Sequence, residues 1–177
     1  MNRSALEHLL RAAAAITGEQ SFYVVGTAAL IASLTDDALV PDVLIRSREA
    51  DLIPASDSSR SIDLIDGALG QSSTFDGTFG YHADGVEFAT VSYAPQGWQS
   101  RAIRFSTPAT NGAIGLCMER HDLAIAKLCA GREKDLEFVA GLVQAGLVDR
   151  QALSARLALV VAPAEIVELV RRRIVSL

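Results

Sequence analysis

The chain has 177 residues, of which 50% are hydrophobic and 21% are charged, so it is long and apolar enough to bury the core of one domain. This composition excludes an intrinsically disordered chain. Sixteen Lys and Arg residues against 21 Asp and Glu residues give a net charge of −5, which excludes a broad surface for nonspecific nucleic-acid binding.

The first half of the chain alternates helical and extended patterns. Apolar spacing and turn residues predict, in order, a helix over residues 4–16, a strand over 22–25, a helical stretch over 27–34, strands over 42–46 and within 49–53, and a helix that is capped in residues 56–59 and ends at Gly67 or Gly70. A glycine separates the first strand from the helical stretch that follows it.

The second half begins with loops and strands and ends in helices. The pattern predicts a loop over residues 71–85, strands over 86–93, 101–106 and 113–118, and helices over 121–145, 150–161 and 163–175. This order predicts an α+β fold whose mixed sheet is backed by helices. We expect residues 1–120 to form the α+β core and residues 121–177 to form a helical region packed on it.

Targeting and redox signals are weak. The apolar runs are too short for a membrane span, and residues 1–19 do not have the layout of a signal peptide. Cys117 and Cys129 lack the CxxC or CxxH spacing of a zinc site or redox motif. We expect a reduced, cytoplasmic protein that does not bind membranes.

Three segments carry candidate chemistry, and the first is the strand-to-helix turn at Gly26 and Thr27. Free backbone N–H groups and a hydroxyl at a helix N-terminus suit a phosphate group. The alternative is structural, because a glycine can turn the chain tightly and a threonine can cap the helix.

The second segment holds Glu49 and Asp51, one residue apart in a predicted strand. Strand periodicity places both carboxylates on one face, where they could share one or two Mg²⁺ ions that hold a nucleoside triphosphate. The alternative is a solvated strand edge.

The third segment is the helix that starts at His121. Lys127 could reach a triphosphate as a point charge, and Arg132 could contact phosphate oxygens in a bidentate manner. The alternative is a solvated helix face on which Glu133 and Asp135 pair with these cations locally.

Together, the turn at 24–28, the segment at 47–52 and above all the helix at 121–135 resemble the small bacterial nucleotidyltransferase-like proteins. These are related to the nucleotidyltransferases of abortive-infection and toxin-antitoxin systems. The resemblance spans residues 22–148 and implies a polymerase-beta-type fold, a minimal mixed sheet with a helical C-terminal region. It further implies that Gly26 and Thr27 form the nucleotide-phosphate turn, that Glu49 and Asp51 bind metal, and that Lys127 and Arg132 lie near the triphosphate.

The chain departs from the family pattern in two places. It has Thr27 where a second small residue, Gly or Ser, is usual, and Glu49 where the first aspartate of an Asp-x-Asp pair is usual. A third carboxylate is expected from a later strand, with Glu87 as the candidate by position and Asp63 and Asp66 as rivals. An incomplete set would leave a protein that binds a nucleotide or a partner without catalysis.

The sequence therefore predicts a Mg²⁺-dependent nucleotidyltransferase that moves NMP from NTP to a hydroxyl of RNA, protein or a small molecule. Glu49, Asp51 and Glu87 are the expected catalytic residues. The alternative is a catalytically inactive binding or regulatory protein of this fold, for example in a toxin-antitoxin pair.

The remaining candidates have plainer interpretations. Trp98 is expected to cover a core edge and not to stack on a base. His82 and His121 have no metal-ligand partner at a typical sequence spacing. The run of arginines at 171–173 either stabilises a helix C-terminus or meets RNA phosphates.

Overall fold

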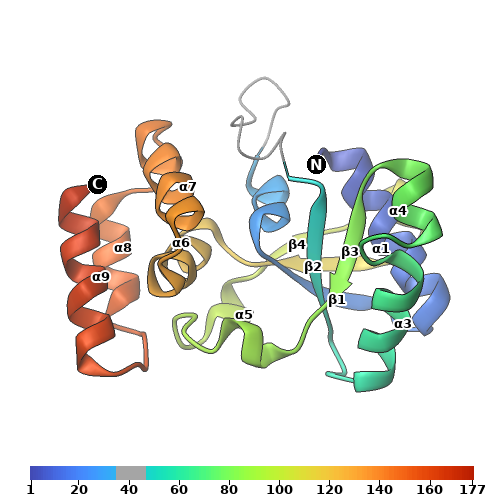
Figure 1. The fold of residues 1–177 in the computed structure, drawn as a ribbon, viewed down its shortest axis with the longest axis horizontal. Coiled ribbons are helices and arrows are strands. Elements are labelled where there is room, and N and C mark those ends of the chain that lie inside the picture. Colours follow the sequence, from blue (N-terminus) through green and yellow to red (C-terminus); the bar gives the residue numbers. More distant parts are fainter. Residues whose placement is uncertain (35–46) are drawn as a thin grey trace.

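A computed structural model describes residues 1–34 and 47–177 and has an α+β fold built on a five-stranded mixed sheet (Figure 1). The strands are β1 (Ser21–Val25), β2 (Glu49–Pro54), β3 (His82–Gly85), β4 (Ile103–Phe105) and β5 (Ile114–Cys117). Their order across the sheet is β3-β2-β1-β5-β4. β1 runs parallel to β5 and antiparallel to β2, β3 is parallel to β2, and β4 is antiparallel to β5.

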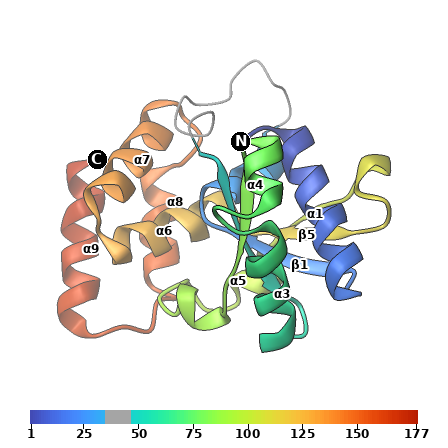
Figure 2. The ribbon, with the colours of Figure 1, turned by 45° about the vertical axis from the view of Figure 1, so that its right-hand side comes forward.

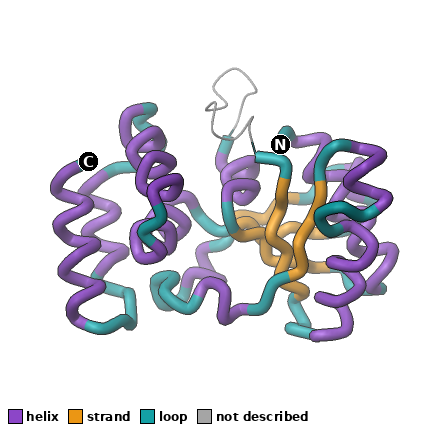
Figure 3. Tube along the Cα trace, in the orientation of Figure 1, coloured by secondary structure: helices purple, strands orange, loops and turns teal. Residues whose placement is uncertain are grey.

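Helices surround this sheet, and the described C-terminal third of the chain is entirely helix and loop (Figure 3). The α-helices are α1 (Arg3–Thr17), α3 (Ser59–Leu69), α4 (Thr74–Phe79), α5 (Trp98–Arg101), α6 (Arg120–Ala130), α7 (Glu133–Gln144), α8 (Arg150–Leu157) and α9 (Ala164–Ser176). The described residues also contain three 3₁₀ helices: η1 (Thr27–Ser33), η3 (Phe88–Val91) and η4 (Pro108–Thr110). None of these described helices is long and apolar enough to span a bilayer.

Helices α1 and α3 cover one face of the sheet. A β-carbon on Gly115 of β5 would lie 3.0 Å from Leu10 of α1, and one on Gly85 of β3 would lie 2.6 Å from the backbone oxygen of Ile62 in α3. The strand register places these two glycines on the same face, because side chains alternate between faces along each strand. The acidic residues of β2 lie on the opposite face.

Helices α6 to α9 form a separate layer on the other side of the strands from α1 and α3, as two views agree (Figures 1 and 2). Helix α6 packs against η1, which follows β1, and it also packs against α7, α8 and α9. Lys127 and Arg132 belong to this layer, so the sheet face that carries the acidic residues lies toward their helices.

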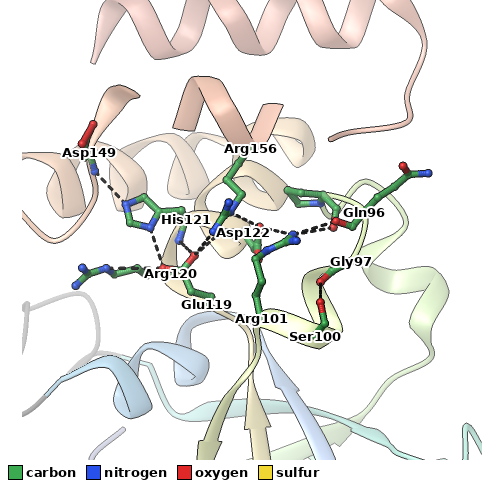
Figure 4. A network of polar contacts seen from close by, with 11 residues as sticks. Gln96, Gly97, Ser100, Arg101, Glu119, Arg120, His121, Asp122, Asp149 and Arg156 are labelled. Atoms are coloured by element: carbon green, nitrogen blue, oxygen red, sulfur yellow. Dashed lines mark hydrogen bonds and ion pairs between the residues drawn. The ribbon is translucent and has the colours of Figure 1, made fainter. Parts of the chain in front are cut away.

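A buried aspartate ties α6 to helices α5 and α8 (Figure 4). Asp122 of α6 is fully buried and lies between Arg101 of α5 and Arg156 of α8. Its carboxylate accepts hydrogen bonds of 2.8 and 3.0 Å from Arg101 and lies 3.0 Å from Nε of Arg156. Two arginines therefore balance one buried charge and fix the orientation of α6.

The same region caps α6. Glu119 precedes the helix and accepts hydrogen bonds from the backbone N–H groups of His121 and Asp122. The ring of His121 contacts Glu119 at 2.8 Å through Nδ1 and accepts a 3.3 Å hydrogen bond from the backbone N–H of Asp149 through Nε2. His121 thus has a structural role at the start of α6.

Most predicted elements are confirmed within a few residues. The structure contains the helix at 4–16, the strands at 22–25, 49–53, 101–106 and 113–118, and the helix that ends before Gly70. The helical stretch at 27–34 forms the 3₁₀ helix η1. The strand predicted at 42–46 lies outside the described residues.

Three predictions are wrong. The predicted loop at 71–85 contains α4 and β3, and the predicted strand at 86–93 holds the 3₁₀ helix η3. The single helix at 121–145 is two helices, because Gly131 takes a left-handed conformation (φ +68°) and ends α6. The core assignment of Trp98 is confirmed, since its side chain is buried and packs edge-on against Tyr23 at a centroid distance of 5.2 Å.

Candidate functional site

Four side chains with metal-binding chemistry share one face of neighbouring strands β2 and β3. In the parallel register, Glu49 lies beside His82 and Asp51 lies beside Asp84. Glu49 and Asp51 are two residues apart, as are His82 and Asp84, so strand alternation places all four on the same face. The prediction that the two carboxylates of β2 share a face is therefore confirmed, and β3 adds two more side chains.

Three of these residues form a tight cluster. One ligand atom each from Glu49, His82 and Asp84 lies within 4.8 Å of the other two. Nε2 of His82 is 4.0 Å from Oδ2 of Asp84. Carboxylate oxygens and imidazole nitrogens are the donors that divalent cations take in proteins, so this cluster has the composition of a cation site.

Asp51 lies next to this cluster and is partly buried. Burial and the negative charges of Glu49 and Asp84 raise the pKa of Asp51 from 3.8 to about 6, although Lys127 and Arg132 act in the opposite direction. The carboxylates therefore repel one another in the absence of a cation. A bound divalent cation would relieve that repulsion.

Gly26 directly follows β1 and lies beside Asp51. It has φ +64° and ψ −164°, and a β-carbon at this position would overlap Oδ2 of Asp51. Both the backbone conformation and the space require glycine here. Thr27 is the first residue of η1. The N-cap of this helix is Gly26, so no side chain caps it. The structure thus joins two of the three predicted segments, while the phosphate-binding role of Gly26 and Thr27 stays a prediction.

The third segment supplies positive charge toward the acidic cluster. Nζ of Lys127 is 3.1 Å from Oδ1 of Asp135, and Nε of Arg132 is 2.6 Å from Oδ2 of the same carboxylate. Burial raises the pKa of Asp135, but hydrogen bonds from Arg132 and Lys127 more than offset this and leave the pKa below its ordinary value. Asp135 is buried and so holds both cations in fixed positions.

These cations also interact with the carboxylates of β2. The hydrogen bond from Arg132 to Asp135 is the main cause that raises the pKa of Arg132, and the charges of Asp51 and Glu49 add to it. Lys127 and Arg132 therefore pair locally with Asp135, as the structural alternative for this segment predicts. They also lie toward the acidic face.

Comparison with known proteins adds one finding. The model of family DUF6036, described as "Nucleotidyltransferase of unknown function", matches residues 4–168. The chain belongs to this family. No curated protein and no solved structure matches the chain. Membership of DUF6036 implies a nucleoside triphosphate as substrate, and nucleotidyltransferases generally use divalent metal ions, to which the cluster on β2 and β3 corresponds in composition.

The sequence of this DUF6036 chain offers three candidates for the third carboxylate of the metal site. Glu87 lies just after β3 and forms the N-cap of η3. It is therefore not part of a strand, although the sequence predicts a strand there. Oδ1 of Asp66 accepts a 2.6 Å hydrogen bond from the backbone N–H of Gly85, and Asp63 is exposed on α3. Among the described residues, Asp84 is the acidic residue of β3 that lies beside Asp51.

Sequence reasoning misses Asp84 and the position of His82, because the turn residues in 71–85 predict a loop. A weak signal is present, since His82 and Asp84 alternate with small residues, as side chains of a short strand do. A strand of four residues that itself contains Asp84 and Gly85 is too short for that alternation to outweigh the turn signals.

Proposed function

We propose that this DUF6036 protein is a metal-dependent nucleotidyltransferase that moves NMP from NTP to a hydroxyl of RNA, protein or a small molecule. The observation that carries the proposal is the arrangement of Glu49, Asp51 and Asp84 on one sheet face, with Lys127 of α6 and Arg132, the N-cap of α7, toward that face. Phosphoryl-group chemistry requires both a cation held by carboxylates and positive groups near the leaving phosphates.

The carboxylates of this face fit a divalent cation. Three carboxylates supply oxygen ligands, and the raised pKa of Asp51 shows that they repel one another without a counterion. The bound ion would polarise the phosphate oxygens and neutralise negative charge that develops during transfer. Glu49, Asp51 and Asp84 are the residues that would hold it.

The chain's own cations would act on the triphosphate. Lys127 is a point charge and Arg132 a planar donor, so together they neutralise charge on the departing pyrophosphate. In the reaction, the acceptor oxygen bonds to the α-phosphorus, the bond from that phosphorus to the bridging oxygen breaks, and pyrophosphate leaves. Asp84, whose side chain is 37% exposed, accepts the proton of the attacking hydroxyl.

The first experiment is thermal unfolding with each NTP, with and without Mg²⁺, on the native chain, on Asp51→Ala and on Asp63→Ala as a charge-matched surface control. A ligand at about one hundred times its dissociation constant stabilises the native state by about 2.7 kcal/mol. We expect a Mg²⁺-dependent shift in the native chain and the control that is lost in Asp51→Ala. The absence of a shift with every NTP would overturn the proposal.

A second experiment follows the transferred group. The protein is incubated with α-³²P-labelled NTPs and separate pools of RNA, protein and small hydroxyl compounds, and release of pyrophosphate is measured in parallel. Label in one pool, absent with Asp51→Ala, identifies the acceptor. NTP binding without label transfer or pyrophosphate release would instead support the inactive, regulatory alternative, including a role in a toxin-antitoxin pair.

A further inference from the structure

We propose that His82 is a metal ligand and that, with Glu49 and Asp84, it forms a mixed nitrogen and oxygen site that prefers Mn²⁺ or Zn²⁺ to Mg²⁺. The inference rests on the proposed function, because it concerns the cation of the same acidic face. It goes further by assigning the ligand that decides which class of cation binds there.

The geometry brings the imidazole to the carboxylates. His82 pairs with Glu49 across the parallel strands, and its Nε2 lies 4.0 Å from Oδ2 of Asp84. The three ligand atoms lie within 4.8 Å of one another, whereas bonds of about 2.0–2.2 Å to one ion would place them about 3–4 Å apart. Small side-chain rotations on two rigid strands would close the difference.

The imidazole of His82 is buried between two carboxylates. Its side chain is only 9% exposed, its Nδ1 faces Asp76 and its Nε2 faces Asp84. Nε2 lies 4.0 Å from Oδ2 of Asp84, which is beyond hydrogen-bond distance. A cation on Nε2 would bridge this gap to the carboxylates of the cluster.

A second carboxylate, that of Asp76, lies behind the imidazole of His82, as is common for histidines that bind metals. Nδ1 lies 3.4 Å from Oδ1 of Asp76, on the side of the ring away from Asp84. Asp76 is itself held by Arg48 at 3.0 Å and by the backbone N–H of Ser72 at 3.1 Å. Histidines that bind metals almost always donate their second N–H to a carboxylate or carbonyl, which fixes the tautomer and the ring orientation.

The donor set then decides the cation. Mg²⁺ takes oxygen ligands and keeps several waters, whereas imidazole nitrogen favours borderline first-row ions. Asp51 does not belong to the three-residue cluster and remains an oxygen ligand on the adjacent pair of the two strands. The nitrogen ligand is therefore confined to the end of β2 and β3 where Glu49 lies.

The test is direct spectroscopy of bound Mn²⁺ in untagged protein without nucleotide. The chain has three histidines, so a ¹⁴N coupling in the electron spin-echo envelope of Mn²⁺ can be assigned by replacing them one at a time. We expect the coupling in the native chain, in His8→Asn and in His121→Asn, and its loss in His82→Asn. By calorimetry, His82→Asn should weaken Mn²⁺ binding about tenfold or more and change Mg²⁺ binding less than about twofold. Asp76→Asn should weaken Mn²⁺ binding about tenfold and keep the coupling.

The outcomes separate this inference from the proposed function. Mn²⁺ that binds the native chain without ¹⁴N coupling, or a coupling that survives in His82→Asn, overturns the role of His82 and leaves the transferase proposal standing. A coupling that is lost in His82→Asn, in a protein that transfers no NMP, supports the site and overturns the transferase. If His82→Asn does not fold, the native spectrum and the variants at His8 and His121 still decide the assignment.

Discussion

Gly26 lies directly against the side chain of Asp51 at the end of β1, since a β-carbon on Gly26 would overlap Oδ2 of the Asp51 carboxylate. The main chain just after β1 thus comes so close to the acidic side chain of the neighbouring antiparallel strand that only glycine fits there. This contact connects the glycine turn to the candidate cation site.

Gly26→Ala should therefore displace the Asp51 carboxylate. We expect loss of the Mg²⁺-dependent stabilisation by NTP, with a loss of stability of about 1–3 kcal/mol from the strained backbone. Gly18→Ala is the matched control, because Gly18 has a similar φ of +77° but no atom within 4 Å of the place that a β-carbon would take. Equal effects of both variants on NTP binding would contradict the role of the contact.

The raised pKa of Asp51 predicts a pH-dependent stability in metal-free protein. Folding raises this pKa from 3.8 to about 6, so the ionised carboxylate destabilises the folded state above pH 6, and the cost disappears as the pH falls toward 4. The stability advantage of Asp51→Asn over the native chain should shrink by about 2 kcal/mol between pH 7.5 and pH 4. Urea unfolding in the presence of a chelator measures this difference. Asp63→Asn, on the exposed surface of α3, is the control, and a pH-independent difference for Asp51→Asn would refute the prediction.

The third carboxylate can be tested by comparing Asp84 with Glu87. Asp84 lies beside Asp51 on the acidic face, whereas Glu87 caps η3 beyond the strand. We expect Asp84→Asn to abolish NMP transfer and weaken divalent-cation binding at least about tenfold, and Glu87→Gln to change both less than about threefold. Isothermal titration and the labelling assay provide the measurements. Larger effects of Glu87→Gln than of Asp84→Asn on both measurements would instead assign the third carboxylate to Glu87.

Asp135 should control the two cations of the helical layer. It is buried and contacts both Lys127 and Arg132, so Asp135→Asn leaves these groups without a counter-charge. We expect a loss of about 3 kcal/mol in the free energy of unfolding and a rise in the KM for NTP. Glu133→Gln, an exposed carboxylate in the same first helical turn, should change neither. An unchanged KM in Asp135→Asn would show that the orientation of these cations does not matter for the nucleotide.

Asp122 should be a main anchor of the helical layer. Asp122→Ala would leave Arg101 and Arg156 facing one another without the buried carboxylate (Figure 4), and we expect a loss of about 3–5 kcal/mol in denaturant unfolding. The exposed pair of Glu168 and Arg171 provides the comparison, and Glu168→Ala should cost less than about 1 kcal/mol. Similar losses in both variants would rule out this anchoring role.

Local patterns in the sequence determined much of the fold. Helical spacing, capping residues and β-rich runs are properties of a few consecutive residues, and they predicted α1, β1, β2, α3 and β5. The same kind of information placed Glu49 and Asp51 on one strand face, because the two-residue period of a strand follows from the backbone alone. The turn at Gly26 was likewise visible as a break between a strand and a helical stretch.

Only the tertiary structure decided which residues meet across elements. The partners of Glu49 and Asp51 depend on the register of β2 with β3, and β3 is a four-residue strand whose own pattern is outweighed by the surrounding turn residues. His82 has no ligand partner at a characteristic sequence spacing, since Glu49 lies 33 positions earlier in the chain. The burial of Asp122 between arginines from two other helices is equally non-local, because it depends on how separate elements pack and not on the residues beside it in the chain.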